Sequence, residues 1–179
     1  ADYDLGDPDS SGYYSVKNTA GIDGFHSDKT VYYKPVNEKS KTVLDISQNG
    51  SSVTYKWQVE VKQTNGSFRG KTISDVMNAA SNDGKSIKSV LDPDSIIMYV
   101  QRNGKGSYET LNSSNYTVVP NADNTSFEIK FNDSEEFDNI NLVQIQYSST
   151  VDVTGLDAGT IINVNNKAAY KGETFEPSA

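Results

Sequence analysis

The sequence predicts an all-β protein whose strands form a two-layer sandwich. Several segments alternate apolar and polar residues, which is the pattern of strands with one buried and one solvated face. Gly, Asn, Asp and Ser recur between these segments, as they do in the turns that join short strands. Only 35% of the residues are hydrophobic, which is low for a helical protein but sufficient for strands buried on one face. With 179 residues, the chain is long enough for one domain with a tail.

Residues 1–29 differ from the rest and are expected to form an acidic lead-in or linker segment. The chain begins ADYDLGDPDSSG, in which aspartates stand in a turn-rich context. This stretch loosely resembles a calcium-binding loop, but it lacks the glycine placement and the distal bidentate glutamate of such loops. We therefore expect a solvated segment, to which Tyr13, Tyr14 and Val16 add a short edge strand. The domain itself is expected to span residues 30–179.

The first strands of this domain are predicted before residue 62. Thr30–Val36 (TVYYKPV) is a strand that stops at Pro35, because proline cannot donate to a strand ladder. The charged sequence NEKSK is expected to form a turn, followed by a short strand at Val43–Ile46. In Val53–Val61 (VTYKWQVEV) the apolar residues all share one face, so this is a central, half-buried strand. Trp57 lies on that face and is expected in the core rather than on a sugar-binding surface.

Further strands are predicted in the second half of the chain. They lie at Lys71–Met77, Ser95–Val100, Tyr116–Val119, Ser126–Phe131, Leu142–Val151 and Ile161–Tyr170. The polar stretch 78–94 is expected to include a helical turn around Ile87–Leu91. About nine strands separated by hairpin turns and loops indicate an immunoglobulin-like sandwich.

Composition excludes several classes of function. The net charge of −8 argues against nucleic acid as a partner and offers no polybasic face for an anionic membrane. There is no cysteine, which excludes disulfides, thiolate catalysis and zinc sites built on cysteine. The single histidine, His26, cannot form a multi-histidine metal site. No cofactor or metal is therefore expected, and no run is apolar enough for a signal peptide or membrane helix.

The last predicted strand carries one polar residue on its inward face. In IINVNNKAAY, Asn166 shares a face with Val164 and Ala168, because successive strand side chains point to opposite faces. A buried amide is costly unless its polar atoms find partners. The ordinary partner is a backbone group; the alternative is a covalent bond. Asn165 would be the inward residue if this strand carries a bulge.

Two other residues could supply such a bond. Asp75 shares a face with Ile73 in its predicted strand and therefore points inward, unless it begins a turn. Lys34 ends the first predicted strand, which in a sandwich commonly lies beside the last one; its face is ambiguous, and it could be an exposed lysine. Burial drives a lysine toward its neutral, nucleophilic amine and a carboxyl toward its acid form. Lys34 could then attack the side-chain carbonyl of Asn166, while Asp75 polarises that carbonyl and moves the proton to the departing ammonia.

Short motifs along the chain occur in the same order in a known family. VYYK (Val31–Lys34), VTYKW, KTISD ending at Asp75 and NNKA near the C-terminus resemble the A-type domain of Gram-positive collagen adhesins and related pilins, over about residues 30–171. The resemblance implies an immunoglobulin-like sandwich closed by a Lys–Asn isopeptide bond with a catalytic acid. It assigns Lys34 as the lysine, Asp75 as the acid and Asn166 as the asparagine. The family's thioester chemistry needs a cysteine and is absent.

We therefore expect a structural or adhesive module of a Gram-positive cell-wall surface protein, extracellular and anchored outside this segment. Its bond would form once, autocatalytically, so the protein is not a turnover enzyme. Expected partners are neighbouring domains of the same protein and a host matrix or cell-surface ligand. The alternatives are a collagen- or fibrinogen-type binding domain, or a carbohydrate-binding sandwich, without a cross-link. A glycosidase would need a carboxylate pair, and none stands out.

Overall fold

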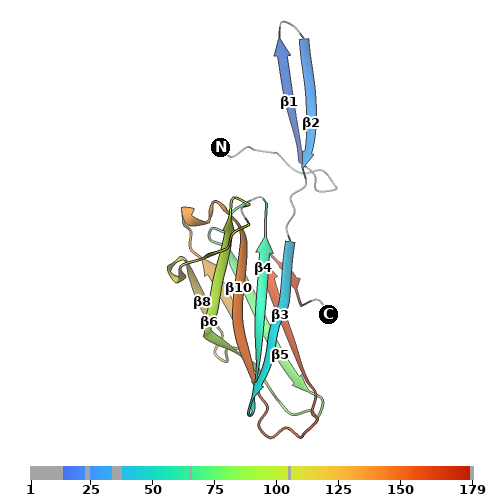
Figure 1. Ribbon diagram of the computed structural model, residues 1–179, viewed down its shortest axis with the longest axis vertical. Helices are drawn as coiled ribbons and strands as arrows, with labels where there is room; N and C mark the ends of the chain where they lie inside the picture. The colour runs from blue at the N-terminus through green and yellow to red at the C-terminus, as the bar shows by residue number, and fades with distance from the viewer. Residues whose placement is uncertain (1–13, 23–24, 34–37, 65, 105, 178–179) are drawn as a thin grey trace.

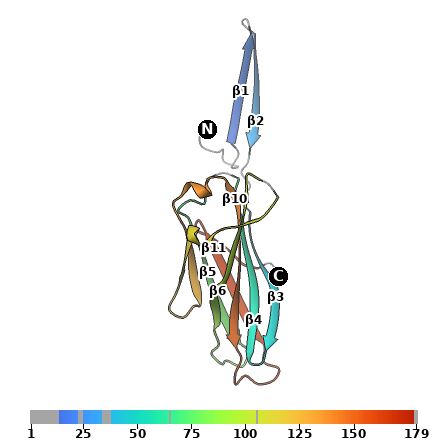
Figure 2. The ribbon, with the colours of Figure 1, turned by 60° about the vertical axis from the view of Figure 1, so that its left-hand side comes forward.

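The computed structural model shows two five-stranded antiparallel sheets packed face to face (Figures 1 and 2). It describes residues 14–22, 25–33, 38–64, 66–104 and 106–177. The strands, in chain order, are β1 (Tyr14–Ile22), β2 (Phe25–Tyr33), β3 (Glu38–Asn49), β4 (Ser52–Lys62), β5 (Thr72–Ser81), β6 (Ser89–Arg102), β7 (Glu109–Thr110), β8 (Tyr116–Pro120), β9 (Ser126–Phe131), β10 (Ile140–Asp152), β11 (Ile162–Tyr170) and β12 (Glu173–Phe175). This confirms the predicted all-β, immunoglobulin-like two-sheet sandwich.

The first sheet has the order β3-β4-β10-β6-β7, and the second has the order β12-β11-β5-β9-β8. The predicted central strand is β4, which pairs with β3 on one side and β10 on the other. β3 is an edge strand and carries a register shift between Val43 and Asp45. In the second sheet, β11 is the second strand from the edge. The short edge strand β12 pairs only with its last residues, Ala168–Tyr170. The two sheets therefore meet, on this side, along β3 and β11.

Alternating side chains from both sheets fill the core. In β4 the residues that were predicted to face inward are at most 9% exposed, and Trp57 is 1% exposed, as expected. Phe68 in the β4–β5 connection is fully buried and packs edge-to-face on Phe131. Burial of this apolar surface is the main term that holds the two sheets together.

Two predicted elements are wrong. No helical turn forms around Ile87–Leu91, because β6 begins at Ser89 and pairs from there with β10. Buried Ser89 and Leu91 alternate with the partly exposed Val90, and this two-residue period is that of a strand. The sandwich also does not begin at Thr30: its first strand is β3, which includes most of the NEKSK segment that was expected to be a turn.

Residues 25–33 instead form β2, which pairs with β1 in a two-stranded sheet of its own. Figure 1 draws this hairpin beyond one end of the sandwich. An isolated two-stranded hairpin is marginally stable in water, so the sandwich from Glu38 onward holds the hydrophobic core. In the described part of the chain, no helix is long and apolar enough to span a membrane.

Candidate functional site

Four polar residues from both sheets meet in the middle of the core. Lys41 comes from β3 and Tyr147 from β10, in the first sheet; Asp75 comes from β5 and Asn166 from β11, in the second. Asp75 pairs with Ala168, and Asn166 pairs with Met77. Asp75 and Asn166 are therefore diagonal neighbours on the inward face of one sheet, while Lys41 and Tyr147 project toward them from the other.

The four side chains form one hydrogen-bonded cluster. The Lys41 ammonium donates to Asp75 Oδ2, to Tyr147 OH at 2.8 Å and to Asn166 Oδ1 at 2.6 Å. Tyr147 OH in turn donates to Asp75 Oδ2 at 2.8 Å and accepts from Asn166 Nδ2 at 3.0 Å. The lysine nitrogen thus lies beside the side-chain carbonyl of Asn166, and the tyrosine hydroxyl lies beside its amide nitrogen.

The cluster is sealed from solvent. The Lys41 and Asp75 side chains are 0% and 1% exposed, and Asn166 is 1% exposed. The rings of Trp57 and Tyr147 lie 5.7 and 5.5 Å from Lys41 Nζ. Outside the cluster, the C-terminal segment covers the sheet edge, since β12 pairs with Ala168–Tyr170 and Pro177 bridges to Lys41.

Burial moves the lysine and the aspartate toward their neutral forms. Desolvation lowers the pKa of Lys41 from 10.5 to about 8, against the opposing charge of Asp75. Desolvation also raises the pKa of Asp75, against the opposing effects of Lys41 and Tyr147. In addition, Asp75 Oδ1 is buried without a hydrogen-bond partner, which further disfavours a full carboxylate charge there.

This arrangement can form an amide. A neutral lysine amine is a nucleophile, and here it lies next to the carboxamide carbonyl of Asn166, with the acid Asp75 beside the amine and the hydroxyl of Tyr147. Attack of Lys41 Nζ on Asn166 Cγ would form a C–N bond and break the bond from Cγ to Nδ2. The proton lost by the amine would pass to the departing ammonia through Asp75 and the hydroxyl of Tyr147, which contacts that nitrogen. Fixed proximity of the reactants can contribute roughly 7–11 kcal/mol toward such a barrier.

The structure brings together two of the three residues that the sequence indicated. Asp75 and Asn166 face inward and adjoin the same lysine. Lys34 lies outside the described residues, and the lysine that occupies the site is Lys41. The second choice for the asparagine, Asn165, is exposed, and its Nδ2 lies 3.5 Å from a carboxylate oxygen of Glu176. β11 pairs with β5 without a register shift, so Asn166, and not Asn165, faces the core.

Sequence reasoning missed Lys41 and Tyr147. Lys41 was assigned to a charged turn, although it has the same parity as Val43, which packs against the core. Tyr147 lies within the predicted strand Leu142–Val151, but that prediction gives its hydroxyl no role. The hydroxyl of a tyrosine on the buried face of a strand needs a polar partner. This requirement could have indicated that Tyr147 is a residue of the site.

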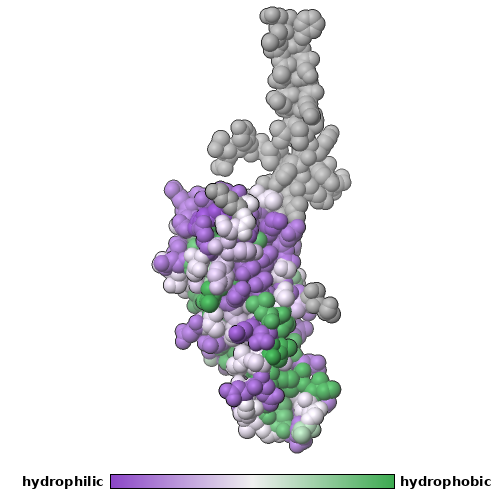
Figure 3. Space-filling model, viewed as in Figure 1, coloured by the Kyte–Doolittle hydropathy of each residue, from purple (hydrophilic) through white to green (hydrophobic). Residues whose placement is uncertain are grey.

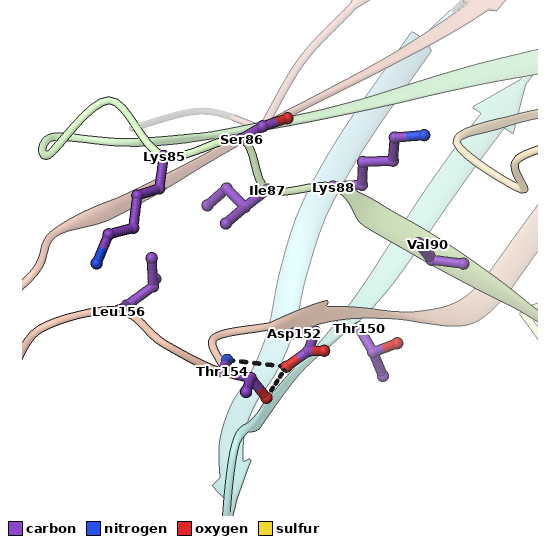
Figure 4. A pocket seen from close by; sticks show the side chains of 9 residues that line it. All are labelled: Lys85, Ser86, Ile87, Lys88, Val90, Thr150, Asp152, Thr154 and Leu156. Carbon is purple, nitrogen blue, oxygen red and sulfur yellow. Dashed lines mark hydrogen bonds between the residues drawn. The ribbon is translucent and has the colours of Figure 1, made fainter.

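A cavity of about 510 Å³ lies outside this cluster, where the β5–β6 connection approaches the end of β10 (Figure 4). It is lined by Lys85, Ser86, Ile87, Lys88, Val90, Thr150, Asp152, Thr154 and Leu156. Its charged groups have partners at the surface: Asp152 accepts from Thr154, Lys85 donates to the backbone of Gly155, and Lys88 pairs with Asp123. All three are exposed, unlike the buried lysine and acid of the Lys41 cluster.

Comparison with known proteins gives structural similarities only. No family model matches the chain, and no curated protein matches it. Among solved structures, the collagen-binding domain of a Staphylococcus aureus adhesin is 13% identical with a TM-score of 0.43, over 77% of this chain and 93% of that one. A structure of the S. aureus collagen adhesin CNA is 14% identical with a TM-score of 0.44, over 86% of this chain and 52% of that one.

The pilus protein RrgB of Streptococcus pneumoniae is also similar, at 12% identity and a TM-score of 0.43, over 91% of this chain and 29% of that one. The chain thus spans about half of the CNA structure and less than a third of RrgB. These neighbours are adhesin domains and pilus proteins of Gram-positive bacteria. The likeness concerns general architecture at low identity, and the chemistry of the site follows from its own geometry.

The buried acid predicts a pH-dependent stability once its cation is removed. In Lys41→Met, Asp75 loses both effects by which Lys41 lowers its pKa, so its folded-state pKa rises further above the ordinary 3.8. The stability gained from holding this proton is complete below the unfolded-state pKa and is lost as the pH rises toward the folded-state pKa. We expect the melting temperature of Lys41→Met to fall as the pH rises above about 4, the ordinary pKa of the carboxyl, toward the raised folded-state pKa, at about 1.4 kcal/mol per unit of pKa elevation.

The matched control is Lys41→Met/Asp75→Asn, which keeps the shape of the site but has no acid to titrate. Its melting temperature should change less over the same pH range, as measured by circular dichroism. Parallel pH profiles for the two variants would show that Asp75 is not held in its acid form by burial.

Proposed function

We propose that this chain is a structural or adhesive module of a Gram-positive cell-wall surface protein, an adhesin or a pilin, stabilised by a self-formed amide between Lys41 and Asn166. The observation that supports this most is the 2.6 Å contact between Lys41 Nζ and Asn166 Oδ1 in the sealed core, beside the acid Asp75. In this proposal Lys41 takes the role that the sequence resemblance assigned to Lys34. The remaining roles, acid for Asp75 and acceptor for Asn166, are unchanged.

The chemistry occurs once per molecule and gives no turnover. Lys41 Nζ attacks Asn166 Cγ, Asp75 donates a hydrogen bond to the carbonyl oxygen and moves the proton, and ammonia leaves. Tyr147 is placed to hand that proton to Nδ2. Because the site is dry, water does not compete with the amine for the carbonyl. The product is an amide, which reducing agents do not break.

The position of the bond suits a protein that bears force. β3 is the first strand of the sandwich, and β11 is its last long strand, so a bond between them ties the two ends of the domain across both sheets. A load applied through the two ends would reach the amide before it could separate the sheets. This is the property expected of a stalk or tip domain exposed to shear on a cell surface.

A host ligand is the proposed external partner, and the exposed apolar surface supports it. Figure 3 shows apolar surface toward the end of the sandwich away from the hairpin. The edge strand β3 presents Leu44 and Ile46, which are 46% and 57% exposed. Leu44 and Ile97 also border a 150 Å³ hollow on the outer face of the first sheet. Exposed aliphatic groups on an otherwise polar face favour a protein ligand, such as collagen or fibrinogen, over a sugar.

Mass measurement on matched variants tests the bond and its lysine. The denatured wild-type protein should be lighter than its sequence by one ammonia, and Lys34→Arg and Asn165→Ser should keep this deficit. Lys41→Arg, Asp75→Asn and Asn166→Ser should have their full sequence masses. A full deficit in Lys41→Arg would remove Lys41 from the bond, and a deficit lost in Lys34→Arg would restore the lysine that the resemblance named.

Loss of the bond should lower stability strongly. The two residues are 125 positions apart, and a covalent link across a loop of this length contributes roughly 5 kcal/mol by analogy with disulfides. Asp75→Asn keeps both bond partners and the shape of the acid but also removes the carboxylate beside Lys41, so Asn166→Ser, which keeps that carboxylate, is measured beside it. The melting temperature of both variants should fall by about 10–20 °C, at about 2–4 °C per kcal/mol. Lys39→Ala, two residues away on the same strand, should stay close to wild type; a similarly small change in Asp75→Asn would contradict a covalent tie.

A further inference from the structure

A second buried polar group, outside the Lys41 cluster, lies just past the C-terminal end of β4. Gln63 follows β4 directly and is 2% exposed. Its Oε1 accepts from Tyr170 OH at 3.0 Å and from Lys171 Nζ at 3.2 Å. Its Nε2 is buried and has no hydrogen-bond partner among the described residues. A buried amide donor without an acceptor is unfavourable, so an acceptor bound at this nitrogen would stabilise the structure.

Gln63 lines a small, partly enclosed cavity of about 50 Å³ whose other polar groups are mostly cationic. The lining residues are Lys39, Val61, Lys62, Gln63, Tyr170, Lys171 and Glu173. Two of the lysines have carboxylate partners, since Lys39 pairs with Glu173, and Lys62 lies 3.5 Å from Glu38. Lys171 has no carboxylate partner among the described residues, and Gln63 is its neutral acceptor.

The positive charge at this cavity is not balanced locally, although the chain as a whole has a net charge of −8. Burial lowers the pKa of Lys171, and the nearby charges of Lys71 and Lys39 lower it further. A bound anion would reduce the electrostatic repulsion among these lysines.

The backbone also directs Lys171 toward this place. Lys171 and Gly172 form the two-residue turn between β11 and β12, and both have positive φ, 49° and 78°. Turns of this kind favour Asn, Asp or Gly at the first position. A lysine there has a conformational cost, and the turn places its ammonium against Gln63.

We propose that this cavity binds a small monovalent anion, a carboxylate or a halide, between the Gln63 Nε2 donor and the Lys171 ammonium. The anion would supply the acceptor that Gln63 Nε2 lacks and the counter-charge that Lys171 lacks. The cavity volume admits a carboxylate head group or a chloride ion but not a sugar or a nucleotide.

The experiment is an NMR titration of the whole chain, with the Gln63 side-chain amide as the reporter. Sodium acetate and sodium chloride are added in separate arms, at an ionic strength held constant with sodium toluenesulfonate, whose anion is larger than the cavity. We expect saturable shifts of the Gln63 amide signals in at least one arm, and the arm with the lower dissociation constant identifies the preferred anion.

Lys171→Gln removes the charge and should weaken binding about tenfold, as expected when a charge-assisted hydrogen bond is lost. Lys88→Gln, at an exposed ion pair elsewhere, should leave the dissociation constant unchanged. Gln63→Met, followed through the backbone amides of Val61 and Tyr170, should abolish binding while Lys171 remains. No saturable shift in either arm, or equal affinities in wild type and Lys171→Gln, would mean that the cavity holds only water and would overturn the proposal.

Discussion

A lysine nitrogen buried between two sheets is the constraint on which the rest of this structure depends. Burying a lysine without compensation is costly, and Lys41 is 2% exposed in the middle of the core. Its surroundings meet that cost with three acceptors, on Asp75, Tyr147 and Asn166. These acceptors come from three different strands, so the strands must hold a single register relative to one another. A shift of one residue in β5 or β11 would turn Asp75 or Asn166 to the solvent face.

The same constraint explains the edges of the sandwich. β3 is an edge strand, and an edge strand is the part of a sheet most easily detached. The Lys41 side chain anchors β3 to the opposite sheet, while Pro177 bridges to its backbone and covers the site from outside. A covalent bond at Lys41 would make that anchor permanent. Non-covalent packing of the remaining core, around Trp57 and Phe68, holds the two sheets together before the bond forms and excludes water from the site.

Much of this arrangement follows from strand parity in the sequence. The alternation in the segments around Asp75 and Asn166 predicted that both side chains face inward, and they do. Tyr147 lies in the predicted strand Leu142–Val151 and shares the parity of Val143 and Ile145, which are buried. Strand parity predicts the inward faces correctly here because β5, β10 and β11 are long, and because the β5–β11 register is regular through the site.

Lys41 could not be predicted in this way. It lies two residues before Val43, where the pairing of β3 with β4 shifts register, so the apolar alternation that marks a strand is absent around it. The charged sequence NEKSK has the composition of a turn, and only pairing with β4 makes it a strand. The VYYK motif drew the assignment to Lys34 instead, although Asp23-Gly24, between residues 14–22 and 25–33, has the composition of a two-residue hairpin turn. In both cases the pairing of two consecutive strands decided the structure, and the periodicity of one segment alone does not encode that pairing.

The most direct measurement of the central claim is a tryptic map of the denatured wild-type protein by tandem mass spectrometry. Trypsin cannot cleave at a lysine whose nitrogen is in an amide, so a bond at Lys41 leaves residues 40–56 as one peptide, joined to residues 131–167, which contain Asn166. The account predicts this branched peptide, at the sum of its two parts less one ammonia, with the fragment ions placing the link at Lys41 and Asn166. Recovery of cleavage after Lys41 together with a linear 131–167 peptide would contradict it.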